Sequence, residues 1–569
     1  MSEDRPVTTP SAALVELAQA YGIATHYTDW RGEPVDVPAE TVTRVLAAME
    51  VDASDPEAAL EQRRLAPWRR MLPPSVVVHD GERREIPVHV PHLAPVEVVV
   101  VLADGGERTL EQVDQWVDPT EVDGEPVGEA RFEVPPGLPL GYHRLRARSG
   151  DLTGETTLVV TPSWLGLPAS LGERRGWGLA AQLYSVRSRR SWGVGDLADL
   201  TDLAVWSGAD LGADYVLVNP LHAAEPVAPM QPSPYLPTSR RFFNPLYLRV
   251  ERVPEYVDLP DADRRTVEKL AQQVHAALDG KDVVDRDTAW TAKREALRLV
   301  HAVPRSAGRE LDYRAFRERH GEALRDVATW SVLAQRHGND ARQWPDGLRD
   351  VDSPQVAAFA REHADEVDFE SWLQWLLDEQ LQAAQAKAVG AGMALGTMHD
   401  LAVGVHPGGA DAWRMRATYA NGIQVGAPPD PSTSSARTGA SRPGGPTGSR
   451  SSATHRSATS SGRCSAMPAG CASTTSSGCS GCGGSRRGGR PPRAPTSTTT
   501  TRRWWACSPS RHTWPGRSSS VRTSAWWSRP PVTTSARGGC WAPRSCGSSA
   551  TPTASRCRPS GGASSAWRR

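Results

Sequence analysis

The sequence predicts an α/β protein whose parallel sheet lies in residues 170–430 and follows two smaller domains. Strand and helix patterns alternate from Gly178 onward, which is typical of parallel α/β architectures with functional groups at the strand ends. Two apolar runs in this region, at 214–222 and 393–400, end in polar residues. The composition of the 569-residue chain changes sharply after Asp430, so its two parts differ in kind.

Residues 1–70 are predicted to form a small helical region. Apolar side chains recur there at helical spacing in two segments, with Leu14, Leu17, Ala18 and Tyr21 in one and Val42, Val45, Leu46 and Met49 in the other. Residues 71–165 are predicted to form a β-sandwich. Their short β-rich runs, such as V-E-V-V-V-V-L at 96–102 and A-R-F-E-V at 130–134, are separated by Gly and Pro turns.

The α/β region contains two buried strands with polar exits. D-Y-V-L-V-N-P-L-H at 214–222 ends with Asn219 and His222, and M-A-L-G-T-M-H-D at 393–400 ends with His399 and Asp400. A helix near 369–389 precedes the second strand, and residues 262–365 read as a mostly helical insertion between the two. These four polar residues could contact a ligand, because active-site groups in such folds follow the strand ends.

The tail, residues 431–569, contains no Asp, Glu, Lys, Asn, Gln, Leu, Ile, Phe or Tyr. It holds all 8 Cys and 21 of the 65 basic residues, which leaves 44 basic against 65 acidic residues before it. Arg-rich tails can bind nucleic acid. However, Cys479 and Cys482 form a lone C-x-x-C without a second ligand pair at zinc-finger spacing, so a tetrahedral zinc site is poorly supported.

The genetic code explains the composition of the tail better than nucleic-acid binding or zinc binding does. Its common residues are those that a GC-rich coding sequence gives when it is read one nucleotide out of register: Leu, Val and Ile codons become Ser, and Asp, His, Tyr and Asn codons ending in C become Thr. Residues 431–569 are therefore interpreted as an out-of-frame translation. We expect them to be disordered, because they have too few large aliphatic residues to build a core.

Four segments of the chain are distinctive: A-A-Q-L-Y-S-V-R-S-R-R-S-W-G-V-G-D-L at 180–197, S-P-Y at 233–235, F-N-P-L-Y-L at 243–248 and H-D-L-A-V-G-V-H-P-G-G-A-D-A-W at 399–413. Together they resemble the actinobacterial 4-alpha-glucanotransferases, also called amylomaltases or disproportionating enzymes. The resemblance covers most of residues 10–430. It implies a (β/α)8 TIM barrel, of which only the N-terminal part is encoded intact, and transfer of α-1,4-glucan segments between maltooligosaccharides without a metal or cofactor.

The implied reaction needs a nucleophile and a general acid/base about 5 Å apart, because retention proceeds through a covalent glycosyl-enzyme. The family takes these carboxylates from R-V-D-H and G-E-D-L-G, and neither motif occurs in the chain as translated. Restoring one base turns 471–475 into V-R-V-D-H, with the nucleophile codon across Ser473 and Thr474. It also turns 519–529 into an amino-acid sequence containing V-G-E-D-L-G, with the acid/base codon across Val521 and Arg522. The translated chain is expected to be inactive and to aggregate or be degraded.

Binding residues are also implied by the resemblance. Tyr235 would stack on a glucose ring, and Asp400 would contact the sugar hydroxyls nearest the cleavage point. The structural alternatives are a core Tyr at the barrel mouth and an ion-paired Asp. His399 and His222 could equally be hydrogen-bonded fillers, and Asn219 could shape the exit of the first strand.

Two further polar residues are assigned to structure. Asp196, in W-G-V-G-D-L, is expected to cap the following helix. His406, in V-H-P-G-G, is expected to be a loop residue.

The implied partners are maltooligosaccharides or α-1,4-glucans, with no nucleic acid and no membrane. Residues 1–12 carry charges and prolines where a signal peptide has an apolar run, which favours a cytoplasmic location. Two alternatives remain open. One is an α-amylase-type hydrolase of the same barrel class, and the other is a non-catalytic remnant that binds glucan or nucleic acid.

Overall fold

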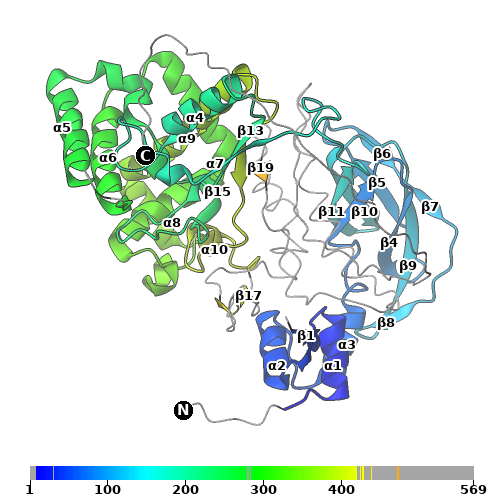
Figure 1. Cartoon of the computed structure of the whole chain (residues 1–569). Coiled ribbons are helices and arrows are strands. Elements are labelled where there is room, and N and C mark those ends of the chain that lie inside the picture. The colour runs from blue at the N-terminus through cyan, green and yellow to red at the C-terminus, as the bar shows by residue number, and fades with distance from the viewer. Residues whose placement is uncertain are drawn as a thin grey trace, which may run out of the picture. The chain divides into compact units, whose positions relative to one another are not determined.

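The computed structural model describes residues 8–419 except 30, 279, 280 and 282, and also 423, 426–427, 437–438 and 471–472 (Figure 1). The described residues all belong to one compact unit, within residues 1–525. The expected disorder of 431–569 concerns residues that lie almost entirely outside the described ones. The inferred catalytic codons also fall on residues outside the described ones: Ser473, Thr474, Val521 and Arg522.

The N-terminal region has three helices and a two-stranded ladder: α1 (Ala12–Ala20), β1 (His26–Thr28), β2 (Pro34–Asp36), α2 (Ala39–Ala48) and α3 (Pro56–Leu65). The Ser11 side chain accepts a hydrogen bond from the Leu14 N–H at the start of α1. Leu17 on α1 and Leu46 on α2 are completely buried in one cluster. The helical spacing in the sequence therefore corresponds to buried helix faces.

The β-sandwich consists of two sheets that pack face to face (Figure 1). One sheet has the order β3-β11-β10-β5-β6, and the other has the order β4-β9-β7 with β8 also paired to β9. Buried residues alternate along β10, as expected when one face of a strand meets the core. The strands are β3 (Ser75–His79), β4 (Arg84–Pro91), β5 (Glu97–Val101), β6 (Glu107–Thr109), β7 (Glu111–Val113), β8 (Thr120–Val122), β9 (Glu125–Val134), β10 (Gly141–Ser149) and β11 (Leu152–Thr161).

The α/β region contains a parallel sheet with the strand order β12-β13-β16-β19. Its strands are β12 (Gly178–Ala181), β13 (Tyr215–Val218), β16 (Gly396–Asp400) and β19 (Cys471–Ala472). Helix α4 (Leu197–Ala209) connects β12 to β13, and α9 (Ala364–Gly390) precedes β16. Both strands expected from the sequence are present but shorter. The first ends at Val218, and the chain then forms a separate antiparallel ladder of β14 (His222–Ala223) and β15 (Ser239–Phe243). Pro220, which has no backbone N–H, interrupts the run.

A helical insertion separates β15 from α9. Its α-helices are α5 (Asp261–Leu278), α6 (Arg286–His301), α7 (Ala307–His337) and α8 (Pro354–Glu362). Helix α7 is broken at Gly321, where φ is 50°. Short 3-10 turns complete the region: η1 (Leu183–Ser185), η2 (Pro245–Tyr247), η3 (Val250–Arg252), η4 (Pro254–Asp258), η5 (Ala341–Gln343) and η6 (Asp346–Leu348). The insertion helices, α9 and strand β13 share one large apolar core.

The remaining described elements are α10 (Ala410–Arg414) and the antiparallel pair β17 (Gly426–Ala427) and β18 (Arg437–Thr438). Within the part of the chain that the structure describes, no helix is long and apolar enough to cross a membrane.

Candidate functional site

The ends of neighbouring parallel strands bring the candidate residues to one edge of the sheet. Strands β13 and β16 pair with Val218 opposite His399. Asn219 directly follows β13 and Asp400 ends β16, so both lie at the carboxyl edge, where ligands of open α/β sheets bind.

The carboxylate of Asp400 lies close enough to the phenol of Tyr235 to influence its pKa. The pKa of the Tyr235 phenol is raised by burial, then by the negative charge of Asp400 and a hydrogen bond to it, and a hydrogen bond to Gln182 opposes the rise. Asp400 is buried, whereas 48% of Tyr235 is exposed. The hydroxyl of Tyr235 thus lies near a buried acid, while part of its ring is exposed.

His222 and His399 are buried neutral imidazoles. Burial lowers the pKa of His222 to about 3, with further contributions from Arg240 and His399, and burial alone lowers the pKa of His399 to about 4. The Nε2 atom of His222 accepts from the Ala402 N–H at 3.4 Å, so the hydrogen lies on Nδ1. Thr397 Oγ1 donates to Gln385, so His399 Nε2, 3.2 Å from that oxygen, is the donor and its Nδ1 carries a lone pair.

Both Nδ1 atoms lack a hydrogen-bond partner among the residues that the structure describes. One is a donor and the other an acceptor. A buried unpaired nitrogen is costly, and a hydroxyl group, which both donates and accepts, would suit either ring. The effect of His399 on the pKa of His222 indicates that the rings are near each other.

The side chain of Asn219 makes its hydrogen bonds to other groups of the protein. Its Oδ1 accepts from the Leu183 N–H at 2.7 Å, and its Nδ2 donates to the Pro220 carbonyl at 2.9 Å and to the Tyr247 hydroxyl at 3.1 Å. The side chain is buried. Asn219 therefore joins the turn after β12 to the exit of β13, as expected of a residue that shapes this loop.

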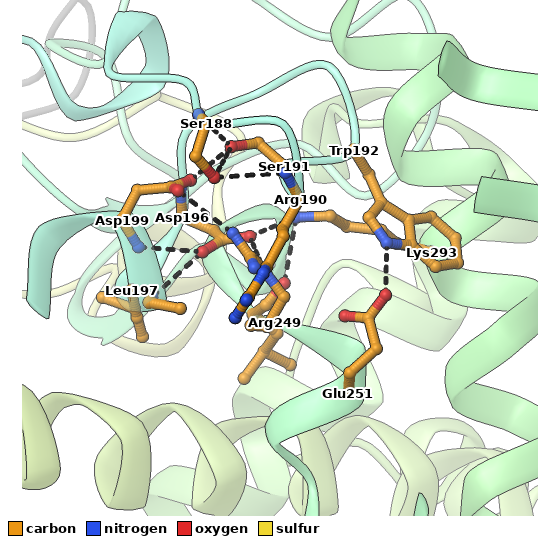
Figure 2. Close-up of polar contacts among 12 residues, drawn as sticks. Ser188, Arg190, Ser191, Trp192, Asp196, Leu197, Asp199, Arg249, Glu251 and Lys293 are labelled. Carbon is orange, nitrogen blue, oxygen red and sulfur yellow. Dashed lines mark hydrogen bonds and ion pairs between the residues drawn. The ribbon is translucent and has the colours of Figure 1, made fainter. Parts of the chain in front are cut away.

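Asp196 caps α4 as the sequence indicates, and its carboxylate accepts from the N–H groups of Ala198 and Asp199. Sequence reasoning missed the buried charges around it (Figure 2). Arg249 donates to Asp196 at 2.6 Å and to Asp199 at 3.1 Å. Lys293, on α6, donates to the carbonyls of Leu246 and Leu248, and its Nζ is 3.8 Å from Asp196.

The position of Lys293 in the sequence could have indicated this cluster of buried charges. It falls on the apolar face of α6, where Ala289, Ala296 and Leu297 are also buried. A Lys at such a position needs buried partners. Burial lowers the pKa of Lys293 and raises that of Asp196, and the attraction between the opposite charges opposes both shifts.

His406 lies in the loop after β16, where its Nδ1 accepts from the Gly408 N–H at 3.1 Å. The described residues contain no group of three or more His, Cys, Asp and Glu that could hold a metal ion.

Comparisons with known proteins place this site in context. Residues 181–436 match a family model described as 4-alpha-glucanotransferase, and residues 71–162 match the MalQ N-terminal beta sandwich domain. The 4-alpha-glucanotransferases of Mycobacterium bovis and Mycobacterium tuberculosis are 54% identical over 434 residues, covering 74% of this chain and 60% of theirs. That of Haemophilus influenzae is 34% identical over 311 residues, covering 52% of this chain and 44% of that protein.

Among solved structures, amylomaltase from Corynebacterium glutamicum matches with a TM-score of 0.73 at 38% identity. The match covers 81% of this chain and 65% of that one. The chain thus spans less than two thirds of the length of these actinobacterial relatives.

Proposed function

The chain belongs to the 4-alpha-glucanotransferase (amylomaltase) family, and we propose that its gene encodes an enzyme that transfers α-1,4-glucan segments between maltooligosaccharides. The reaction proceeds through a retaining covalent glycosyl-enzyme, with a sugar hydroxyl as the final acceptor. The active product carries the catalytic carboxylates that one restored base brings into frame.

The parallel strands are, in this proposal, the first strands of a (β/α)8 barrel. Strands β12, β13 and β16 lie side by side in the order in which they occur in the chain. Helix α4 joins the first pair and α9 leads into the third strand, as successive βα units require.

The register of β19 is the observation that carries the proposal. β19 pairs in parallel with β16, and Ala472 lies opposite Asp400. The restored reading independently puts V-R-V-D-H at 471–475, with the nucleophile codon across Ser473 and Thr474. The nucleophile codon inferred from the restored reading thus falls directly after β19, the strand that pairs with β16.

Substrate binding is assigned to four residues. Tyr235 stacks on a glucose ring with the exposed part of its own ring, and Asp400 accepts hydrogen bonds from sugar hydroxyls. His222 and His399 form hydrogen bonds to sugar hydroxyls through Nδ1, the ring atom that has no partner among the residues that the structure describes. Asn219 acts indirectly, through Leu183 and Tyr247.

The 569-residue chain as translated has no transferase activity in this proposal. Ser, Thr, Val and Arg stand where the two catalytic codons would be. None of them can form the glycosyl ester as the nucleophile or donate the proton at a matched pKa as the general acid.

Two measurements test the proposal. The first is resequencing of the genomic DNA around the codons for residues 426–439, where one additional base is expected. The second compares the 569-residue chain with the frame-restored product on maltotriose. Glucose together with a ladder of longer maltooligosaccharides from the restored product alone would support transfer. A net gain of reducing ends without longer products would indicate a hydrolase and contradict the proposal.

A further inference from the structure

The loop between β14 and β15, residues 224–238, carries Tyr235, and three side chains of the helical insertion bond to its backbone. The Met230 N–H donates to Asp287 Oδ1 at 2.8 Å. Trp290 Nε1 donates to the Pro226 carbonyl at 3.2 Å, and Asn339 Nδ2 donates to the Val227 carbonyl at 2.9 Å. We call Asp287, Trp290 and Asn339 the clamp residues.

The helix that provides two of the clamp residues is itself fixed. Asp287 and Trp290 lie in the first turns of α6, and Lys293 follows one turn later. Lys293 is completely buried, and its ammonium group is bonded to backbone carbonyls beside the Asp196 cluster. An ammonium in such a site cannot move without losing buried partners. The clamp residues therefore hold the loop against a rigid element.

A small cavity lies under the same loop. It has a volume of about 20 Å³, room for one water molecule, and its lining includes Glu225, Met230, Trp290 and Glu370. Glu225 Oε2 also accepts from the Gln231 N–H at 3.0 Å, which closes the loop on itself. The loop is thus hydrogen-bonded both to the helical insertion and within itself.

The insertion also holds the segment that follows Asp400. The Gly408 carbonyl accepts from the Ala341 N–H at 3.0 Å and from Trp330 Nε1 at 3.2 Å. The two loops then meet directly, because the His406 N–H donates to the Pro237 carbonyl at 2.7 Å. One insertion therefore sets the relative placement of the elements that carry Tyr235 and Asp400.

We propose that Asp287, Trp290 and Asn339 are positioning residues for glucan binding, which hold the Tyr235 loop in its binding arrangement without touching the ligand. The inference rests on the proposed function, since it assigns the purpose of the clamp to Tyr235. A ring that is already oriented pays less conformational entropy when a ligand stacks on it, so loosening the loop should weaken binding.

The test uses Asp287, because a matched set of variants exists. Asp287→Ala removes the acceptor of the Met230 N–H, whereas Asp287→Asn keeps an oxygen that can accept it. Asp261→Ala is the control, since Asp261 is an exposed acid in the first turn of the neighbouring insertion helix α5. Hydrogen exchange of residues 226–237 is measured in the frame-restored full-length protein and in the 569-residue chain, without ligand.

Exchange in this segment should rise in Asp287→Ala, and should stay near the parent level in Asp287→Asn and in Asp261→Ala. Unchanged exchange in Asp287→Ala would overturn the positioning role. This readout does not depend on glucan binding, so it separates failure of this inference from failure of the proposed function. If the frame-restored protein binds no maltoheptaose, the proposed function fails.

Binding of maltoheptaose by the frame-restored protein, followed by titration calorimetry, supplies the second readout. Asp287→Ala should weaken binding about tenfold, as expected for loss of a hydrogen bond to a charged group. The same substitution in a Tyr235→Ala background should have little further effect, because the two residues act through one contact. Additive losses would show that Asp287 affects binding without Tyr235 and would contradict the inference.

Discussion

The carboxylate of Asp400, at the end of β16, lies near the phenol of Tyr235, in the loop that follows β14, and helps to raise its pKa. The contact combines a half-exposed aromatic ring with a buried acid. It orients the ring and leaves part of its surface for a ligand.

Substitution of Tyr235 should separate stacking from anchoring. In the frame-restored protein, Tyr235→Ala should weaken maltoheptaose binding about tenfold or more through loss of the aromatic surface. Tyr235→Phe keeps the ring and loses only the interactions of the hydroxyl with Asp400 and Gln182, so its loss should be smaller. Calorimetric titration measures both, and equal losses in the two variants would argue against stacking.

Replacing Asp400 by Asn should lower the pKa of Tyr235 toward its ordinary value. After burial, the charge and hydrogen bond of Asp400 are the causes that raise this pKa. An ultraviolet titration of phenolate formation in Asp400→Asn, compared with the parent protein, measures the change. Tyr235→Phe is the control, since it removes the phenol that titrates. An unchanged titration in Asp400→Asn would mean that the two groups are not in contact.

Stability should fall as the pH is lowered below about 6.5, because His222 and His399 are buried as neutral rings. Their folded pKa values of about 3 and about 4 lie below the ordinary 6.5, so the unfolded chain binds more protons in this window. The two groups together cost about 4 kcal/mol of unfolding free energy between about pH 7.5 and about pH 5. Urea unfolding at both pH values measures this loss.

The matched controls for this pH effect are single histidine variants. His399→Gln should remove about half of the pH-dependent loss. His26→Gln should leave the loss unchanged, because His26 is exposed on β1. A loss that is the same in all three proteins would assign the effect to other groups.

Lys293→Met should destabilise the folded protein by about 3 kcal/mol. Methionine fills similar volume, but the carbonyls of Leu246 and Leu248 lose their donor and the acids beside Arg249 lose a positive neighbour. Chemical denaturation measures the change. Lys269→Met, at an exposed position on α5, should stay within about 0.5 kcal/mol of the parent. Similar small effects in both variants would show that the buried cluster contributes little.

Features that depend on neighbouring residues could be predicted from the sequence. Helical spacing identified the buried faces at Leu17 and Leu46, and alternation identified the strands of the sandwich. The helix cap at Asp196 was predictable because the capping carboxylate bonds to amides within three residues of it. The strand ends at Asn219 and Asp400 were predictable for the same reason, since a polar exit after an apolar run is a local pattern.

Features that join distant segments could not be predicted from the sequence. Periodicity does not say that Asn339 reaches the Val227 carbonyl, that Lys293 reaches Asp196, or that Tyr235 meets Asp400. These contacts depend on how the insertion helices pack against the parallel strands, and packing is decided by the whole core at once. Local chemistry thus determined the elements and the strand-end candidates, whereas only tertiary packing decided which side chains are brought together and which are buried without charge.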